Sequence, residues 1–296
     1  TRNYQGVIDE FTKKTGISKS SVSRAFKRAS QKDLDAINHA DLASYKFISI
    51  MIDGTGVGEK TVVVAIGITD SGEKIPLGIR EGDTENKTIV EDLLSSLIDR
   101  KFTFAGQRIL AVLDGGKALK SAVKALWGDD VVIQRCSIHK LRNVRDYLPK
   151  ENHGQLFGRF KKIMGLNSFD QAKREMNLLH EWLLTISNDA AASLKESGDD
   201  ILALHKLGVS GDLRKSLCST NLIESLIGVV KTKSGKVSNW GYHPKLKQKI
   251  PRDKILRWVA SSIQTHRPKF RRIRGVKEIQ MLIAALDCLD QIKIPA

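Results

Sequence analysis

Three runs rich in β-branched residues decide the fold: KFISIMID at residues 46–53, TVVVAIGIT at 61–69 and KIPLGIR at 74–80. Runs of this composition are typical of β-strands. Glycine-containing turns at residues 54–58 and 70–72 separate them, and short turns of this kind join neighbouring antiparallel strands. The sequence therefore predicts a three-stranded antiparallel meander.

Helices and strands alternate after the meander. The pattern predicts an amphipathic helix over residues 84–100, a strand over 109–113, a helix over 118–127 and a short strand over 131–134. Strands joined by helical crossovers are parallel, and their connections are right-handed. The order βββαβαβ is the topology of the RNase H fold. We therefore predict an α/β protein with an RNase H-like mixed five-stranded sheet.

The rest of the chain is predominantly helical. An almost continuous helical pattern begins at residue 139, includes a long amphipathic stretch at 170–186, and predicts an all-α insertion. Further helices are expected at 219–232, 254–266 and 276–292. The expected organisation is a helix-turn-helix segment (1–40), the first part of the RNase H-like core (41–138), the α-helical insertion (139–218), and the last part of the core with basic C-terminal helices (219–296).

Two short helices around Gly16, at residues 4–15 and 18–29, resemble a helix-turn-helix. Glycine permits the turn, and Ser18 suits the cap of the second helix. The exposed face of that helix would reach the major groove of DNA through Ser20, Ser21, Arg24 and Lys27. An ordinary helical hairpin is the alternative. Because the chain starts at Thr1 inside this pattern, we expect a larger N-terminal region before it.

Composition restricts the partners of the protein. The chain has 296 residues, 41% of them hydrophobic and 28% charged, with a formal net charge of +16 and a pI near 9.7. Such a balance favours a polyanion, most often nucleic acid, with an acidic membrane surface as the rival. No apolar run approaches the ~18–20 residues of a bilayer span. Three separated cysteines form no disulfide framework, which fits a reducing cytoplasm.

Basic residues concentrate towards the C-terminal end. Between Lys231 and Lys277 there are 15 Lys/Arg and one acid, Asp253. A stretch with this charge is expected to contact DNA phosphates, and the alternative is a basic face that is only solvated. The candidate contacts are Lys231, Lys233, Lys269, Arg271, Arg272 and Arg274.

Two aspartates occupy matching positions at the ends of predicted strands. Asp53 and Asp114 each follow an apolar run and precede glycine. In this topology the two strands are neighbours, so the carboxylates would lie close together and repel unless a cation neutralises them. Oxygen ligands suit Mg²⁺ or Mn²⁺, and two ions ~3.5–4 Å apart assist an in-line phosphoryl displacement. The alternative is that Asp-Gly is only turn chemistry.

Glu224 is the candidate for a third carboxylate. It lies in STNLIES, residues 219–225, at the start of a predicted helix. Its spacing from Asn221 also suits a capping box, in which the glutamate only stabilises the helix start. The residues alone leave both interpretations open.

Four strings occur along the chain in a characteristic order: MIDGTG (51–56), VLDGGKALKSAV (112–123), QRCSIHKLRNV (134–144) and STNLIES (219–225). Over residues 45–285 the chain thereby resembles the Mutator family of DNA transposases, including its bacterial insertion-sequence members. The resemblance implies an RNase H-like DDE catalytic domain, with Asp53, Asp114 and Glu224 as its catalytic and metal-binding residues. The 110-residue gap between Asp114 and Glu224, with its helical insertion, belongs to the same pattern.

The resemblance also places Cys136 and His139 at the end of the fifth strand, beside the active site. There His139 would hydrogen-bond a carboxylate or a DNA phosphate. A Cys-x-x-His pair is also half of a zinc site, although its candidate partners, His153 and Cys218, are weak ones. A buried cysteine and a satisfied histidine are the third interpretation.

The resemblance implies a DNA transposase that cleaves DNA at the ends of an element and transfers the resulting 3′-hydroxyl to another DNA. The implied cofactors are two Mg²⁺ or Mn²⁺ ions. The implied partners are the terminal inverted repeats, target DNA and a second copy of the chain in a homodimer, without a membrane. Lys140 and Arg142 are further candidates for DNA contact. The expected location is cytoplasmic, at the nucleoid of a prokaryotic cell. The alternatives are an RNase H-like structure-specific nuclease and a domesticated DNA-binding protein.

Overall fold

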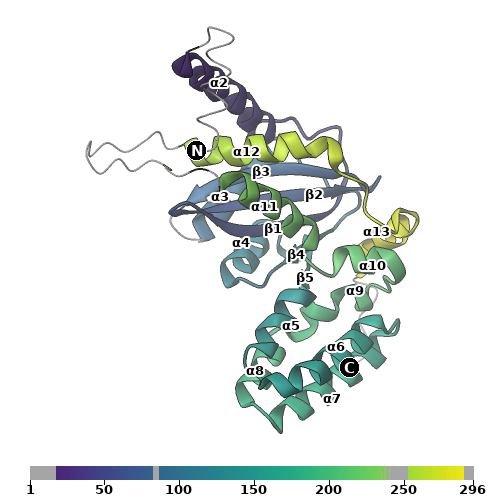
Figure 1. Ribbon diagram of the computed structural model, residues 1–296. Coiled ribbons are helices and arrows are strands. Elements are labelled where there is room, and N and C mark those ends of the chain that lie inside the picture. The colour runs from purple at the N-terminus through teal and green to yellow at the C-terminus, as the bar shows by residue number, and fades with distance from the viewer. Residues whose placement is uncertain (1–17, 83–86, 236, 238–239, 241–252, 290–296) are drawn as a thin grey trace.

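A five-stranded mixed sheet forms the centre of the protein (Figure 1). The structure is a computed structural model, and it describes residues 18–82, 87–235, 237, 240 and 253–289. The strand order is β3-β2-β1-β4-β5. β1 to β3 pair antiparallel, whereas β4 pairs in parallel with both β1 and β5. The bounds are β1 Phe47–Val57, β2 Lys60–Thr69, β3 Lys74–Gly82, β4 Ile109–Leu113 and β5 Val131–Arg135. The predicted mixed five-stranded sheet is therefore confirmed.

Helices cover both faces of this sheet (Figure 1). One face carries α2 (Lys19–Asn38), α11 (Asn221–Ser234), α12 (Lys254–His266) and α13 (Ile279–Asp287), and the other carries α3 (Lys87–Asp99) and α4 (Lys117–Trp127). Each face has a hydrophobic core: the first core lies against α2, α11, α12 and α13, and the second core lies against α3 and α4. Within β1, Met51 belongs to the first core, whereas Ile50 and Ile52 belong to the second. Since both faces are buried, the strands are continuous apolar runs without polar alternation.

The segment between β5 and α11 is helical. We call it the helical insertion; it comprises α5 (Ser137–Arg145), α6 (His153–Gly165), α7 (Phe169–Leu184), α8 (Asn188–Glu196), α9 (Ala203–Lys206) and α10 (Gly211–Leu217). Its first four helices have a hydrophobic core of their own, whereas Leu204 of α9 and Leu213 of α10 belong to the core against the sheet. The helical insertion extends away from one end of the sheet (Figure 1). The Gln134 side chain of β5 joins the two parts, because it donates to the Ile201 carbonyl and accepts from the Leu204 N–H, both at 3.0 Å.

The first strand is longer than predicted. Residues 54–57, expected as a turn, continue β1 and pair with residues 60–63 of β2. Thr55 and Val57 are β-branched and buried, which favours a strand over a turn. The expectation that Asp53 ends its strand is therefore wrong, since it lies inside β1.

The helix predicted for residues 18–29 is also longer, and continues to residue 38 as α2. No glycine or proline interrupts it, and Leu34 and Ile37 are buried in the first core. Phe26 packs against Trp258 of α12 in a tilted arrangement, with ring centroids 4.8 Å apart and 47° between the ring planes. Tertiary packing therefore extends the helix beyond the local signal.

The helices predicted near the two ends of the chain can be compared with the described residues. Ser18 caps α2 as expected and accepts a hydrogen bond from the Ser21 N–H at 3.2 Å. The helix predicted for residues 4–15 lies outside the described residues. The helix predicted for 276–292 begins as a 3₁₀ turn and continues as α13. The 3₁₀ helices are Gly128–Asp130, Lys150–Asn152, Gly198–Leu202, Arg267–Lys269 and Val276–Glu278. Among the described residues, no helix has the length and apolar character needed to cross a bilayer.

Candidate active site

Asp53 and Asp114 lie on neighbouring strands at the centre of the sheet. In the parallel register of β1 and β4, the last pair of residues is Ile52 with Leu113. Asp53 and Asp114 are the residues that directly follow this pair. β4 ends at this point while β1 continues with its antiparallel partner. The fold therefore brings together the two carboxylates that the sequence singled out.

Asp53 is buried, with 7% of its surface exposed. Burial, followed by the charge of Asp114, raises the pKa of the Asp53 carboxyl to about 6, and Glu224 adds to the increase. His139 and the Gly54 N–H, which donates to Asp53 Oδ1 at 2.9 Å, oppose it. Carboxylates this close repel each other, and a divalent cation would relieve the repulsion.

Glycines shape the loop that carries Asp114. The Gly116 N–H donates to Asp114 Oδ1 at 2.8 Å, which orients the carboxylate. Gly115 has a φ of +103°, and a Cβ at this position would lie 1.2 Å from Nη1 of Arg135. Only glycine allows both this backbone conformation and this close approach. The Arg135 guanidinium therefore packs directly against the backbone next to Asp114.

Sequence reasoning missed Arg135. It is the last residue of β5, is 9% exposed, and lies 3.5 Å from Glu196 through Nη2. Its contacts with Gly115 and Glu196 join segments far apart in the chain, so no local pattern marks it. The one available signal is its place beside Cys136 in the QRCSIHKLRNV string.

Glu224 lies in the first turn of α11 and is held by three side chains. Its Oε1 accepts a hydrogen bond from Thr220 Oγ1 at 3.1 Å and lies 3.8 Å from His139 Nε2. Its Oε2 lies 3.5 Å from Arg142 Nη1. The capping box between Asn221 and Glu224 is not formed, because Thr220 is the N-cap and Glu224 bonds its hydroxyl.

Cys136 connects the end of β5 to the start of α11. Its sulfur is the N-cap of α5 and accepts from the His139 N–H at 3.5 Å. The Thr220 N–H (3.4 Å) and hydroxyl (3.3 Å) also reach this sulfur, and the same hydroxyl lies 3.3 Å from His139 Nδ1. Cys136 thus directly follows β5, and His139 lies in the first turn of α5 close to Glu224.

The electrostatics of this pair follow from the same contacts. Burial alone would raise the pKa of the Cys136 thiol, but hydrogen bonds from His139 and Thr220 outweigh it and the pKa is lowered. The hydrogen bond to Cys136 raises the pKa of His139 against the effect of burial, and the charges of Glu224 and Asp53 add to the increase. The contacts of the pair therefore shift the two pKa values towards each other.

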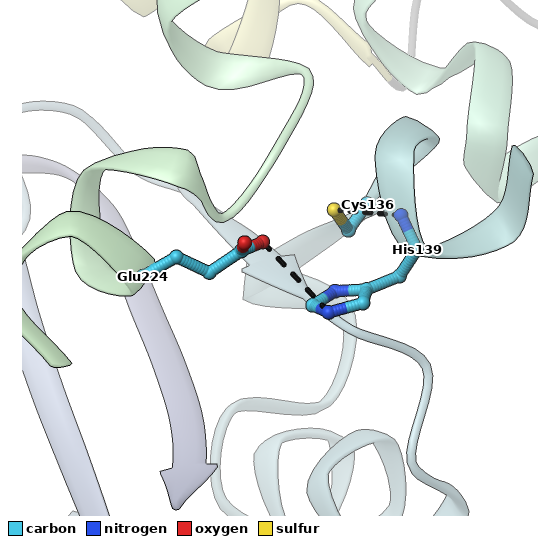
Figure 2. Close-up of side chains that lie close together, drawn as sticks. All are labelled: Cys136, His139 and Glu224. Carbon is cyan, nitrogen blue, oxygen red and sulfur yellow. Dashed lines mark hydrogen bonds and ion pairs between the residues drawn. The ribbon is translucent and has the colours of Figure 1, made fainter. Parts of the chain in front are cut away.

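Figure 2 shows the carboxylate of Glu224 directed at the His139 ring, with the Cys136 sulfur close to both. One ligand atom from each of the three side chains lies within 4.8 Å of the other two. Neither Asp53 nor Asp114 belongs to this group. In this conformation Glu224 is thus oriented towards the Cys-x-x-His pair.

The two partners considered for a zinc site lie elsewhere. His153 Nε2 is 3.1 Å from the Leu148 carbonyl, and Cys218 Sγ is 3.7 Å from the Lys215 carbonyl. Neither belongs to the group with Cys136. Among the described residues, His153 and Cys218 therefore do not complete the zinc site that was considered as an alternative for Cys136 and His139.

Lys140 and Arg142 differ although they share a helix. Arg142 is exposed and lies at Glu224. Lys140 is buried, because its ammonium donates to Glu196 (2.5 Å) and to the Ser193 carbonyl (2.7 Å) of α8. The expectation that Lys140 faces DNA is therefore wrong for this conformation.

The other predicted DNA contacts are spread over two surfaces. On α2, Ser21 is half-buried and the remaining candidates are exposed: Ser20, Arg24 and Lys27. Lys233 is half-buried on α11, while the others are exposed: Lys231, Lys269, Arg271, Arg272 and Arg274. Arg272 pairs with Glu73 at 3.2 Å. These positions leave the side chains accessible to a polyanion.

The architecture and the site define a mixed α/β protein with acidic residues gathered on adjacent parallel strands. Comparison with known proteins gives the family: a family model described as "Transposase, Mutator family" matches residues 1–244. The chain belongs to this family of transposases.

Its relatives are transposases of bacterial insertion sequences. The chain is 26% identical to the transposase for insertion sequence element IS905 of Lactococcus lactis, over 71% of this chain and 53% of the relative. It is 27% identical to that for IS1201 of Lactobacillus helveticus (66% and 53%). It is 29% identical to that for IS256 in transposon Tn4001 of Staphylococcus aureus (56% and 42%). The chain thus spans about half the length of the curated relatives it matches.

Proposed function

We propose that this chain is the catalytic part of an insertion-sequence transposase, with an RNase H-like core that performs metal-dependent phosphoryl transfer on DNA. The observation that carries the proposal is that Asp53 and Asp114 directly follow the last registered pair, Ile52 and Leu113, of the adjacent parallel strands β1 and β4. Burial, followed by the charge of Asp114, raises the pKa of Asp53 to about 6. Such a pair suits a divalent cation.

The donor set fits Mg²⁺ or Mn²⁺, which prefer oxygen ligands. Asp53, Asp114 and Glu224 would hold two ions, with Glu224 turning from His139 towards the aspartates by rotation of its own side chain. When bound, the ions supply charge stabilisation for the attacking and leaving oxygens of the phosphodiester. The Gly54 and Gly116 N–H groups orient the aspartates for this role.

The chain's own residues would orient the DNA. Arg142 is exposed beside Glu224 and suits a phosphate near the reacting bond. Exposed cations on α2 and in residues 267–274 suit phosphates farther away. A helix-turn-helix over residues 1–40 would read the terminal inverted repeats, and a homodimer would hold the two element ends. The carboxylates bind ions and do not attack, so no covalent protein–DNA intermediate forms.

The relatives' names support transposition as the reaction in which the cleaved 3′-hydroxyl attacks a second DNA. A structure-specific nuclease would use the same carboxylates but only water as the nucleophile. An assay for joined products separates the two reactions. Cleavage without any joining to target DNA would replace the transposase by the nuclease.

The test uses Asp53→Asn, Asp114→Asn and Glu224→Gln, each expected to abolish cleavage in Mg²⁺ or Mn²⁺ while retaining DNA binding. Binding is retained because phosphate contacts lie elsewhere. Asp130→Asn and Glu181→Gln remove exposed carboxylates and serve as matched controls with normal activity. Cleavage near the normal rate in any of the three variants removes that residue from the site, and full activity in excess chelator removes the metal.

A further inference from the structure

The site contains a second set of metal-binding groups that the phosphoryl-transfer proposal does not use. Cys136, His139 and Glu224 each offer one ligand atom within 4.8 Å of the others. The 3.8 Å between His139 Nε2 and Glu224 Oε1 is too long for a hydrogen bond. It is close to the spacing of two ligands on one tetrahedral ion, which is roughly 3.5 Å for bonds of ~2.0–2.3 Å.

We propose that Cys136, His139 and Glu224 form a distinct site for one thiophilic divalent ion such as Zn²⁺, and that Glu224 is shared between this site and the Asp53–Asp114 ions. The binding part of this inference stands on the cluster itself. Its consequence for catalysis rests on the proposed function.

The ligand types select the ion. Thiolate and imidazole suit Zn²⁺ and Co²⁺, whereas Mg²⁺ and Mn²⁺ prefer carboxylate and water. A site with Cys, His and carboxylate ligands leaves a fourth position open to water. Only small side-chain movements, of about an ångström, bring 4.8 Å separations to tetrahedral spacing.

The surrounding contacts support the ligands. The Cys136 sulfur accepts from the His139 N–H and the Thr220 N–H, donors that stabilise a thiolate, and the single proton of the Thr220 hydroxyl can be donated either to this sulfur or to Glu224. The Thr220 hydroxyl also lies 3.3 Å from His139 Nδ1, which leaves Nε2 directed at Glu224. On ion binding the thiol proton passes to solvent, as does the Nε2 proton where His139 carries one.

An ion can reach this cluster from the solvent side. The His139 and Glu224 side chains are 27% and 26% exposed, and Cys136 lies behind them. The opening is therefore formed by the imidazole and the carboxylate, and the sulfur closes the inner end. Occupancy would retain Glu224 at His139 and withhold the third carboxylate from Asp53 and Asp114. A thiophilic ion is thus expected to inhibit the Mg²⁺-supported reaction.

The test uses Co²⁺ as the probe in the intact protein, because cobalt–thiolate bonds give a charge-transfer absorption band. The expected result is one Co²⁺ per chain with this band, displaced by Zn²⁺. The band persists in Cys218→Ser/Cys288→Ser, which leaves Cys136 as the single cysteine. It is lost in Cys136→Ser. His139→Gln and Glu224→Gln keep the sulfur and are expected to bind Co²⁺ at least about tenfold more weakly.

Absence of a thiolate band in the wild-type protein overturns the proposal, as does a band that survives Cys136→Ser or is unaffected by both His139→Gln and Glu224→Gln. Cys136→Ser removes the N-cap of α5, which could impair folding. The His139 and Glu224 variants keep this cap, so they test the site without that effect. Asp53→Asn/Asp114→Asn separates the two hypotheses, because it should keep the band and lose cleavage. If the Asp53→Asn/Asp114→Asn variant shows the band and still cleaves DNA, only the proposed function is refuted. If this variant loses cleavage but the wild-type protein shows no band, only the present inference is refuted.

Discussion

Asp53 in the sheet and His205 in the helical insertion are both buried titratable groups, and their pKa values shift in opposite directions. The pKa of Asp53 is raised to about 6 by burial and then by Asp114. The pKa of His205 is lowered to about 4 by burial and then by the charge of Arg214. In both cases the folded protein favours the neutral side chain.

The difference lies in what surrounds each group. Asp53 has two further carboxylates within electrostatic range, so its neighbours increase the cost of its charge. His205 is 2% exposed in α9, with no acidic group among the causes of its shift. Both groups have a like-charged neighbour, Asp114 at Asp53 and Arg214 at His205, so the size of a pKa shift does not by itself indicate a functional site. What distinguishes Asp53 is that three carboxylates converge there.

The largest difference between the sheet and the helical insertion is expected in the effect on DNA cleavage of replacing a glycine that has a positive φ. Gly115→Ala places a Cβ 1.2 Å from Arg135 Nη1 and displaces the loop of Asp114, so cleavage should fall about a hundredfold or more. Gly198→Ala in the insertion is the matched control, because its φ is +52° and nothing lies within 4 Å of its Cβ. It should cost about 1 kcal/mol of stability from backbone strain and leave activity unchanged. Equal losses in both variants would show that backbone strain, and not the Arg135 contact, is responsible.

The next effect is the acid sensitivity contributed by His205. Its folded pKa, about 4, lies below its unfolded value of 6.5. Its contribution to stability is therefore present above pH 6.5 and lost as pH falls towards 4. His205→Leu should remove this loss, which amounts to about 3 kcal/mol. Denaturant unfolding at pH 7 and pH 4 measures it, and a variant with the wild-type pH dependence would contradict the prediction.

Asp53 should give a slightly smaller effect of opposite sign. Its folded pKa, about 6, lies above the unfolded value of 3.8, so its stability contribution is present below pH 4 and lost as pH rises through 6. In chelator, Asp53→Asn should be more stable than the wild type by about 2–3 kcal/mol at pH 8, at about 1.4 kcal/mol per unit of pKa, and should match it at pH 4. Adding Mg²⁺ should stabilise the wild type and not the variant. No gain at pH 8 would mean that Asp53 is not destabilised by its neighbours.

The sequence predicted the sheet better than the contacts around its site. Continuous apolar runs in β1 and β2 reflect burial on both faces, so strand identity and order could be predicted. The end of β1 could not, because glycines near Asp53 suggested a turn where tertiary pairing extends the strand. Lys140 and Arg142 are alike in sequence, yet only the distant α8 determines that Lys140 is buried. The Thr220 and Arg142 contacts of Glu224 likewise depend on side-chain conformations that no periodicity encodes.

The smallest expected effect of a single substitution is on DNA affinity. It compares the exposed basic residues of the sheet domain with those of the helical insertion. Four cations follow α12 on the sheet side, all of them exposed: Lys269, Arg271, Arg272 and Arg274. The insertion also carries exposed cations, and neutralising four of them gives a variant of equal net charge: Lys161, Lys162, Lys173 and Arg174.

If the first set contacts phosphates, neutralising it releases fewer counterions on binding. The log–log salt slope should then become shallower by about 3 units, at ~0.9 per contact. Arg272 contributes least, since it already pairs with Glu73. Specific and random DNA should weaken alike, because phosphates carry no sequence information. The insertion variant should keep the wild-type slope. Equal changes in both variants would mean that net charge alone attracts DNA, and an unchanged slope in the first would exclude residues 269–274 from the DNA contact.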